Sequence, residues 1–133
     1  MVLLDRQSLG PGHCMIIPRR HVTEIHELNE IEYMALFQLA QRLAPCLKEV
    51  MRTRAVGFVG FGSGLPHAHL HLVPHDEDAV LLEPLKYLRN LSDEELQQDA
   101  ARIRSCFERP RGVKRRCGRA KSTRDPSVRG VAR

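Results

Sequence analysis

Three histidines alternate with apolar residues near the middle of the chain, at His67, His69 and His71. Successive side chains of a β-strand point to opposite faces, so the alternation predicts a strand over 67–73 with the three imidazoles on one face. A rise of ~3.3 Å per residue places neighbouring histidines roughly 6.5–7 Å apart. The apolar residues of the same stretch occupy the other face, where they can enter a core: Ala68, Leu70 and Leu72.

Two kinds of chemistry suit three imidazoles on one face. An ordinary core would leave their six ring nitrogens in need of partners, which disfavours a purely structural role. Neutral imidazole is a common zinc ligand, and a His-x-His pair on this strand could chelate a metal with a third or fourth ligand from His75, Asp76 or Asp78. A neutral imidazole can also attack phosphorus while a second histidine binds a phosphate oxygen. The spacing alone leaves both possibilities open.

A glycine-rich segment leads directly into the histidines, with the sequence Gly60-Phe-Gly-Ser-Gly-Leu-Pro66. Glycine lets a ligand come close to the backbone because it carries no side chain. The amides of such a loop can meet the negative charge of a phosphate. If the ligand is a phosphate, this segment would supply those amides.

The charge of the chain divides it into two parts. The chain has 133 residues, which is long enough for one domain with its own core. Its formal net charge is +5. Residues 109–133 hold ten Lys/Arg and one Asp, whereas residues 1–108 hold more acidic than basic residues. We therefore expect a domain over 1–108 and a basic, disordered tail over 109–133. Such a tail could contact nucleic acid weakly and without sequence preference, although no aromatic residues are interleaved to stack on bases.

The sequence lacks the signals and the cysteine pattern that several classes of protein require. No basic region followed by an apolar run opens the chain, and no apolar run approaches the ~18 residues of a membrane span. The four cysteines are scattered without a Cys-x-x-Cys pair, which argues against a zinc ribbon or a thioredoxin motif. We expect a cytoplasmic protein with free thiols and no membrane partner.

The elements that must position the histidines can be placed from periodicity and turn signals. Apolar runs at 1–5 and 13–17 predict two strands that pair as a hairpin, and 55–59 predicts a third. Asn29 and Glu32 form a capping-box pattern at the start of a long amphipathic helix, which Pro45 should kink or end. Ser92 begins a second helix of about four turns.

Two segments resemble the histidine triad (HIT) superfamily. Residues 5–21 read Asp-Arg-Gln-Ser-Leu-Gly-Pro-Gly-His-Cys-Met-Ile-Ile-Pro-Arg-Arg-His and resemble the family signature D-x-x-P-x-x-x-G-H-x-L-V-I-P-K-x-H. The motif His67-x-His69-x-His71-x-Val73-Pro74 is similar to the family's histidine hallmark. The resemblance covers about residues 2–107. It implies an α+β fold with an antiparallel sheet of about five strands, a long helix, a C-terminal helix and a homodimer.

The resemblance also implies an activity. It suggests a nucleotide hydrolase or transferase, with hydrolysis favoured, that cleaves a purine nucleoside phosphoramidate or dinucleoside polyphosphate at the α-phosphate. No cofactor and no metal would be needed. His69 would be the nucleophile that forms a nucleotidyl-histidine, and His71 would hydrogen-bond the phosphate. His67 would orient its neighbours, and His21 would support the triad from the upstream strand.

Nucleotide-binding residues follow from the same resemblance. Asp5 would accept hydrogen bonds from the ribose hydroxyls, while Gly62, Ser63 and Gly64 belong to the loop that presents donors to the phosphate. Two other interpretations of the sequence stay open. One is a nucleotide-binding module with little catalysis, and the other is a metal-dependent hydrolase that uses a His-x-His pair of the histidine strand.

Overall fold

A four-stranded antiparallel sheet carries the histidine strand. The computed structural model describes residues 1–60 and 65–110. The sheet has the strand order β1-β3-β5-β4, formed by β1 (Val2–Leu4), β3 (Cys14–Ile16), β5 (Leu70–His75) and β4 (Ala55–Val59). A separate two-stranded ribbon joins β2 (Gln7–Ser8) to β6 (Arg89–Asn90). The expected hairpin of the first two apolar runs is confirmed, because β1 pairs antiparallel with β3.

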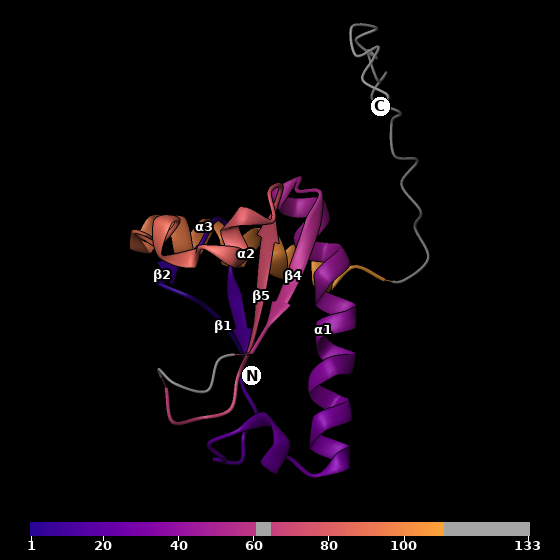
Figure 1. Cartoon of the computed structure of the whole chain (residues 1–133). Helices are drawn as coiled ribbons and strands as arrows, with labels where there is room; N and C mark the ends of the chain where they lie inside the picture. Colours follow the sequence, from indigo (N-terminus) through magenta and orange to yellow (C-terminus); the bar gives the residue numbers. More distant parts are fainter. Residues whose placement is uncertain (61–64, 111–133) are drawn as a thin grey trace, which may run out of the picture.

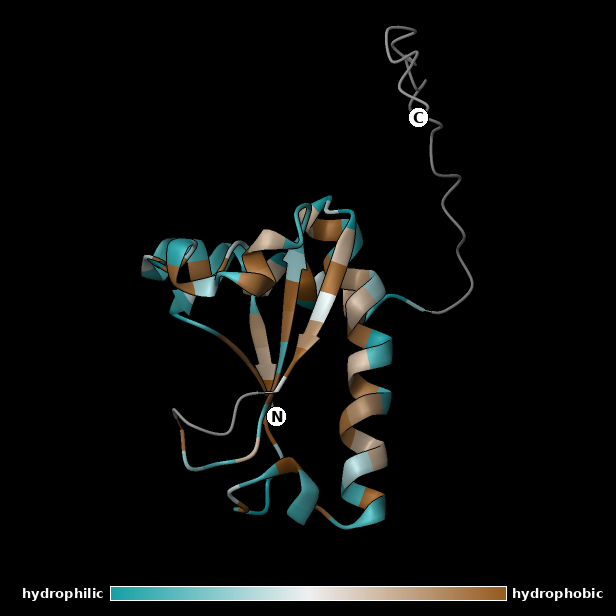
Figure 2. Cartoon of the chain, viewed as in Figure 1, coloured by the Kyte–Doolittle hydropathy of each residue, from teal (hydrophilic) through white to brown (hydrophobic). Residues whose placement is uncertain are grey.

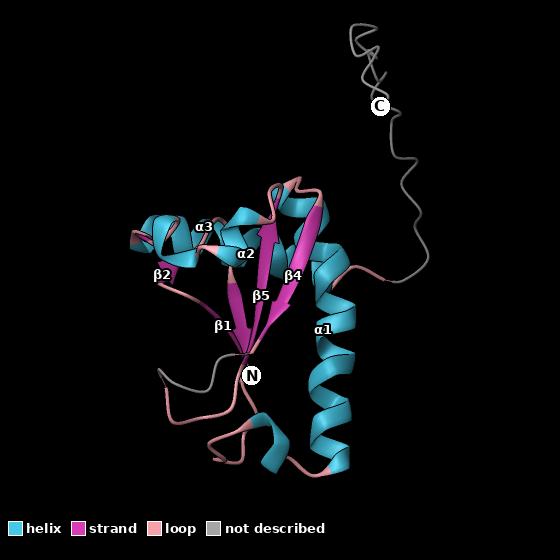
Figure 3. Ribbon diagram, viewed as in Figure 1, coloured by secondary structure: helices cyan, strands magenta, loops and turns pink. Residues whose placement is uncertain are grey.

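Helices lie along one side of the sheet and across one end of its strands, as Figures 1 and 3 show. The long helix α1 spans Glu30–Met51, the short helix α2 spans Ala79–Leu82 and the C-terminal helix α3 spans Asp93–Phe107. Two single 3₁₀ turns, η1 (Ile25–Glu27) and η2 (Pro84–Lys86), lie in the connections. The predicted α+β architecture with an antiparallel sheet, a long helix and a C-terminal helix is confirmed. In the described ranges no helix is both long and apolar enough to cross a membrane.

The ends of α1 follow from local chemistry. The Asn29 side chain accepts from the Glu32 amide at 2.9 Å, and the Glu32 carboxylate accepts from the Asn29 amide at 3.2 Å, which completes the predicted capping box. The helix does not end at Pro45, contrary to one of the two outcomes expected there. Pro45 is exposed, while Cys46 and Leu47 beside it are buried. Packing of the buried side therefore continues the helix past the missing amide donor.

The core lies between α1 and one face of the sheet. Ala68, Leu70 and Leu72 enter it as predicted, and they meet Leu43 and Leu47 of α1. Figure 2 shows hydrophobic colouring in the middle of β5. Because this side of β5 is occupied by the core, the opposite side is left for the histidines and α2.

Helix α2 covers the far end of that opposite side. Gly57 of β4 lies opposite Val73, and a Cβ built on Gly57 would lie 2.5 Å from Leu81 Cδ1. The glycine that interrupts the β4 pattern is therefore explained by the close approach of α2. His71, two residues earlier in β5, lies beyond this contact on the same side of the strand.

A disulfide joins α1 to α3, which corrects the expectation of free thiols. Cys46 and Cys106 are bonded across a Cα–Cα distance of 5.8 Å and a sequence separation of 60 residues. Nothing in the local sequence pairs two cysteines so far apart. The buried Cys14 is free, and burial raises the pKa of its thiol to about 12, so it is not a nucleophile.

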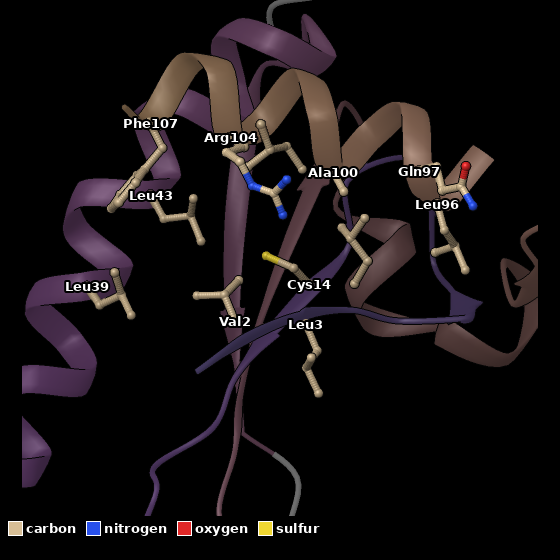
Figure 4. Close-up of a pocket in the computed structure, with 12 residues that line it drawn as sticks. Val2, Leu3, Cys14, Leu39, Leu43, Leu96, Gln97, Ala100, Arg104 and Phe107 are labelled. Atoms are coloured by element: carbon tan, nitrogen blue, oxygen red, sulfur yellow. The ribbon is translucent and has the colours of Figure 1, made fainter. Parts of the chain in front are cut away.

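The apolar cavity drawn in Figure 4 lies away from the histidines. It has a volume of about 450 Å³ and is enclosed by side chains of β1, α1 and α3, including Val2, Leu43 and Phe107. Cys14 supplies its sulfur, and Arg104 lies at its boundary. No histidine lines it, so the chemistry of the chain has to be sought on the other side of the sheet.

Candidate active site

The histidine segment enters the sheet later than its alternation predicts. Strand β5 begins at Leu70, so His67 and His69 lie in the connection before it. There the Ala68 amide donates to the Val22 carbonyl at 2.7 Å instead of to a neighbouring strand. The predicted start of the strand at 67 is therefore wrong, whereas the inward direction of Ala68 is right.

His71 is paired with a histidine from another strand connection. In the register of β3 and β5, Met15 lies opposite His71, so His13 is a diagonal neighbour on the same face. Its Nε2 lies 2.9 Å from Nδ1 of His71. Both rings are largely buried, at 2% and 9% exposure. The structure thus adds to the site a histidine to which the sequence motifs assigned no role.

The proton positions in this pair follow from one backbone donor. The Leu9 amide donates to Nδ1 of His13 at 3.1 Å, so that nitrogen is the acceptor and the proton of neutral His13 is on Nε2. His13 Nε2–H then donates to Nδ1 of His71, which places the His71 proton on its Nε2. The chain of contacts thus assigns His71 the role of an Nε2–H donor.

Burial keeps this pair neutral. It lowers the pKa of His71 to about 4, and the neighbouring His13 and His69 add to the effect. Burial also lowers the pKa of His13, although the nearby Asp5 carboxylate opposes the change. At neutral pH both rings are therefore imidazoles with one donor and one acceptor each.

His69 has the complementary arrangement. Its Nδ1 lies 2.8 Å from the His67 carbonyl oxygen, which can only accept, so Nδ1 carries the proton and Nε2 carries the lone pair. No residue in the described ranges bonds that Nε2. Its ring meets that of His71 edge-on, with 4.7 Å between centroids. The two neighbouring rings therefore offer a nucleophilic nitrogen and a hydrogen-bond donor.

A second cavity is bordered by His69. It has a volume of about 370 Å³, and its other lining residues include Ile25, Tyr33 and Gly60. Gly60 begins the glycine-rich segment, so the cavity is bordered by both His69 and the start of that segment.

His67 and His21 lie together at the edge of the site. Their ring centroids are 4.8 Å apart. His21 is exposed, and His67 Nε2 is buried without a hydrogen-bond partner in the described part of the chain. The backbone carbonyl of His67 contacts Nδ1 of His69. His21 contacts His67, whereas the histidine that bonds the triad directly is His13.

Asp5 lies on the His13 side of the site. Its Oδ2 is 3.9 Å from His13 Nε2, and its Oδ1 accepts from the Gln7 amide at 3.0 Å. The side chain remains 20% exposed, so a carboxylate oxygen can still accept from a ligand hydroxyl. The remaining predicted nucleotide-binding residues, Gly62, Ser63 and Gly64, lie outside the described residues.

One group of side chains is close enough to hold a metal. Ligand atoms of Asp5, His13 and His71 all lie within 4.8 Å of one another, and two imidazoles with a carboxylate form a common donor set for zinc. The metal ligands suggested by the sequence do not belong to this group. His75 lies at the far end of β5, and Asp76 accepts from the Arg54 amide at 2.8 Å. A metal at the observed group would replace the proton between the two histidines.

His13 could have been found from the sequence. It stands in the Gly-His step of the segment 5–21, and it precedes an apolar run whose pattern indicated only a strand. Strand alternation puts position 13 on the same face as position 15, but the pairing partner of that strand was needed to bring it to His71. The missing information was therefore the register and not the residue type.

Known proteins resemble this chain in sequence and in fold. The HIT domain matches residues 1–78. A bis(5'-adenosyl)-triphosphatase of Dictyostelium discoideum is 25% identical over 117 residues, covering 80% of this chain and 78% of that protein. An AP-4-A phosphorylase of Mycobacterium tuberculosis is 31% identical over 78 residues, or 54% of this chain. The chain spans only 40% of that phosphorylase.

The fold is shared with solved structures. A hypothetical histidine triad nucleotide-binding protein from Sulfolobus tokodaii superimposes with a TM-score of 0.69 at 19% sequence identity. The match covers 80% of this chain and 76% of that chain. At this identity the likeness concerns the fold.

Proposed function

Because the chain belongs to the histidine triad family, we propose that it is a nucleotide hydrolase that acts through a covalent nucleotidyl-histidine. Its substrates would be dinucleoside polyphosphates or purine nucleoside phosphoramidates, cleaved at the α-phosphate. The relatives include a bis(5'-adenosyl)-triphosphatase and an AP-4-A phosphorylase, which favours the dinucleoside polyphosphates.

The observation that carries the proposal is the opposite proton placement in two adjacent imidazoles. His69 presents a lone pair on Nε2, because its Nδ1–H donates to the His67 carbonyl. His71 presents Nε2–H, because its Nδ1 accepts from His13. Nucleophilic substitution at phosphorus needs both: a nitrogen to attack and a donor for the oxygen charge.

The proposed reaction has two displacements. In the first, the His69 Nε2 lone pair forms a bond to the α-phosphorus while the bond to the leaving group breaks with its electron pair. A polyphosphate leaves as an anion, whereas an amine also takes up a proton from solvent. In the second, water attacks the same phosphorus, its proton is lost to solvent, and the bond to Nε2 breaks to release the nucleoside monophosphate and neutral His69.

The remaining residues of the proposed site bind the nucleotide. Asp5 would accept from the ribose hydroxyls, since its carboxylate is partly exposed beside His13. Gly62, Ser63 and Gly64 would bind the phosphate. His67 would hold His69 through its carbonyl, and His21 would support His67 from the exposed side.

The direct test is capture of the covalent intermediate. The protein would be mixed briefly with a dinucleoside tetraphosphate and denatured at alkaline pH, because a phosphorus–nitrogen bond to imidazole is labile in acid. Peptide mass analysis should then place a nucleotide monophosphate on His69 and find none in His69→Ala. The exposed Glu94→Gln on α3 provides the control and should give the same adduct as the unaltered chain.

Two outcomes would replace the proposal. Nucleotide bound tightly without adduct or product would indicate a binding module. Activity that disappears with a chelator and returns with Zn²⁺, and that depends on Asp5 and His13, would indicate a metal-dependent hydrolase at the Asp5–His13–His71 group. Persistence of turnover in His69→Ala would by itself remove the nucleophile.

We also propose that two copies of the chain form a homodimer through α1 and β4. Strand β4 is an edge of the sheet, and Phe58 on it is 45% exposed. Tyr33 and Met34 of the adjacent helix are exposed as well. A sheet edge beside exposed large apolar side chains is a frequent site of self-association.

Light scattering coupled to size exclusion tests the dimer. The chain should elute with twice its monomer mass, and Phe58→Asp should shift it toward the monomer. Leu82→Asp is the control, because Leu82 is also an exposed apolar residue but lies on α2. Equal dissociation by both substitutions, or none by Phe58→Asp, would contradict this interface.

A further inference from the structure

We propose that Asp99 of α3 is a positioning residue for the histidine pair, because its carboxylate holds the Gly12 amide and so sets the loop that presents His13 to His71. This inference rests on the proposed function of the two histidines. It extends the site to the C-terminal helix, beyond the segment that the HIT domain matches.

Asp99 reaches the loop through a buried hydrogen bond. Its Oδ2 accepts from the Gly12 amide at 3.0 Å, across 87 positions of sequence, and the residue is only 7% exposed. A hydrogen bond to a carboxylate is stronger than one to a neutral acceptor, most of all where water is excluded. The loop amide is therefore held at one point by the helix.

The Asp99 carboxylate is linked to α1 through Arg102. Its Oδ1 lies 3.4 Å from Arg102 Nη1, one turn further along α3. Arg102 Nη2 donates to the Val50 carbonyl at 2.5 Å, near the C-terminal end of α1. Asp99 is thus positioned on both of its oxygens, by Gly12 on one and by Arg102 on the other. This connection makes α1, α3 and the loop one hydrogen-bonded unit.

The conformation of the loop depends on Gly12, because the backbone is left-handed at this residue. Gly12 has φ of 75°, in the left-handed region, and a Cβ at this position would lie 2.7 Å from Met51 Cε. The next residue is His13, whose amide donates to the Gly10 carbonyl at 3.2 Å. A shift of the Gly12 peptide therefore moves His13 directly and disturbs its bond from the Leu9 amide.

Docking of α3 does not by itself require Asp99. Ile103 and Phe107 pack the helix on the core, and the disulfide from Cys106 joins it to α1. A buried carboxylate costs desolvation that an apolar residue at the same position would avoid. Its direct bond to the residue before His13 gives the carboxylate a role that packing lacks.

The test compares Asp99→Asn and Asp99→Leu with Glu94→Gln, an exposed acid on the same helix. Nitrogen-15 spectra of the imidazoles report the tautomers and the His13–His71 hydrogen bond without reference to turnover. Steady-state hydrolysis of a dinucleoside tetraphosphate gives kcat and KM separately. Glu94→Gln should match the unaltered chain in both measurements.

Asp99→Leu should lose the His13–His71 signature and lower kcat by ~10²-fold, as expected for a misplaced reacting group, with KM changed only a few-fold. Asp99→Asn retains an acceptor oxygen, so its kcat and its imidazole signal should lie between those of Asp99→Leu and the unaltered chain. If Asp99→Leu does not fold, Asp99→Asn provides the test. At a temperature where Asp99→Asn is folded, the hydrogen bond between His13 and His71 must still be weaker than in the unaltered chain. An unchanged imidazole spectrum in the folded variants would overturn the inference and leave Asp99 a docking residue.

The two proposals fail in different ways. An unaltered chain that shows the imidazole bond but no nucleotide turnover contradicts the proposed function alone. Turnover with an imidazole bond that is indifferent to Asp99 contradicts only the positioning role.

Discussion

Mild acid should destabilise this protein through His71. The pKa of His71 is lowered to about 4 in the folded chain, chiefly by burial, against an ordinary value of 6.5. Between these two values the unfolded chain binds more protons than the folded one. Stability is therefore full above about pH 6.5 and is progressively lost as the pH falls toward 4.

The size of the effect follows from the gap between the two pKa values. At ~1.36 kcal/mol per pH unit, the gap corresponds to at most about 3 kcal/mol of unfolding free energy, because screening by water reduces it. His13 adds to the loss in the same direction, since burial lowers its pKa as well. A typical domain has only about 5–15 kcal/mol in total, so the change is measurable.

Urea unfolding near pH 7 and near pH 4 measures the effect. The comparison is between the unaltered chain and His71→Asn, which cannot gain a proton in this range. Carboxylates titrate in both proteins and cancel in the difference. The exposed His26→Asn serves as the control and should keep the full pH dependence. If His71→Asn loses as much stability in acid as the unaltered chain, the histidine pair is not buried and neutral as described.

Three further substitutions or treatments test other parts of the structure. Gly12→Ala should cost about 1–3 kcal/mol in urea unfolding, because the left-handed backbone and the Met51 side chain both oppose a Cβ; an unchanged midpoint would contradict that geometry. Cys106→Ser should lower stability by about 2–4 kcal/mol, since the disulfide to Cys46 closes a long loop, and a reductant should lower it equally in the unaltered chain but not further in the variant. Deletion of 109–133 should leave the melting temperature nearly unchanged, because the ion pair that Arg109 forms with Glu49 is exposed and stabilises the fold little; a drop of several degrees would show that the deleted segment docks.

Local signals in the sequence predicted the elements well. The capping box at Asn29 and the helix start at Ser92 were confirmed, because each depends on residues three positions apart. The hairpin of β1 and β3 followed from two apolar runs with a turn between them. The face of β5 that enters the core also followed from alternation, since Leu70 and Leu72 are buried there.

Long-range contacts could not be predicted from the same signals. The ribbon of β2 and β6 consists of two-residue strands, which have no periodicity to detect. The Cys46–Cys106 disulfide joins residues that no motif connects. His13 and Asp99 became parts of the site only through strand register and helix docking. The candidate nucleophile could be named from its motif, whereas the groups that hold it in place depend on the folded chain.

The ties between the N-terminal loop and the C-terminal helix have a consequence for the order of folding. The Leu91 amide donates to the Arg6 carbonyl at 3.0 Å, and Arg6 also pairs with Asp93 at the start of α3. During synthesis on a ribosome, all seven histidines emerge before these partners do. A nascent chain ending near residue 78 would therefore contain every imidazole of the site and none of these ties. The ability to bind a nucleotide in a defined pose should appear late in translation, when α3 leaves the exit tunnel.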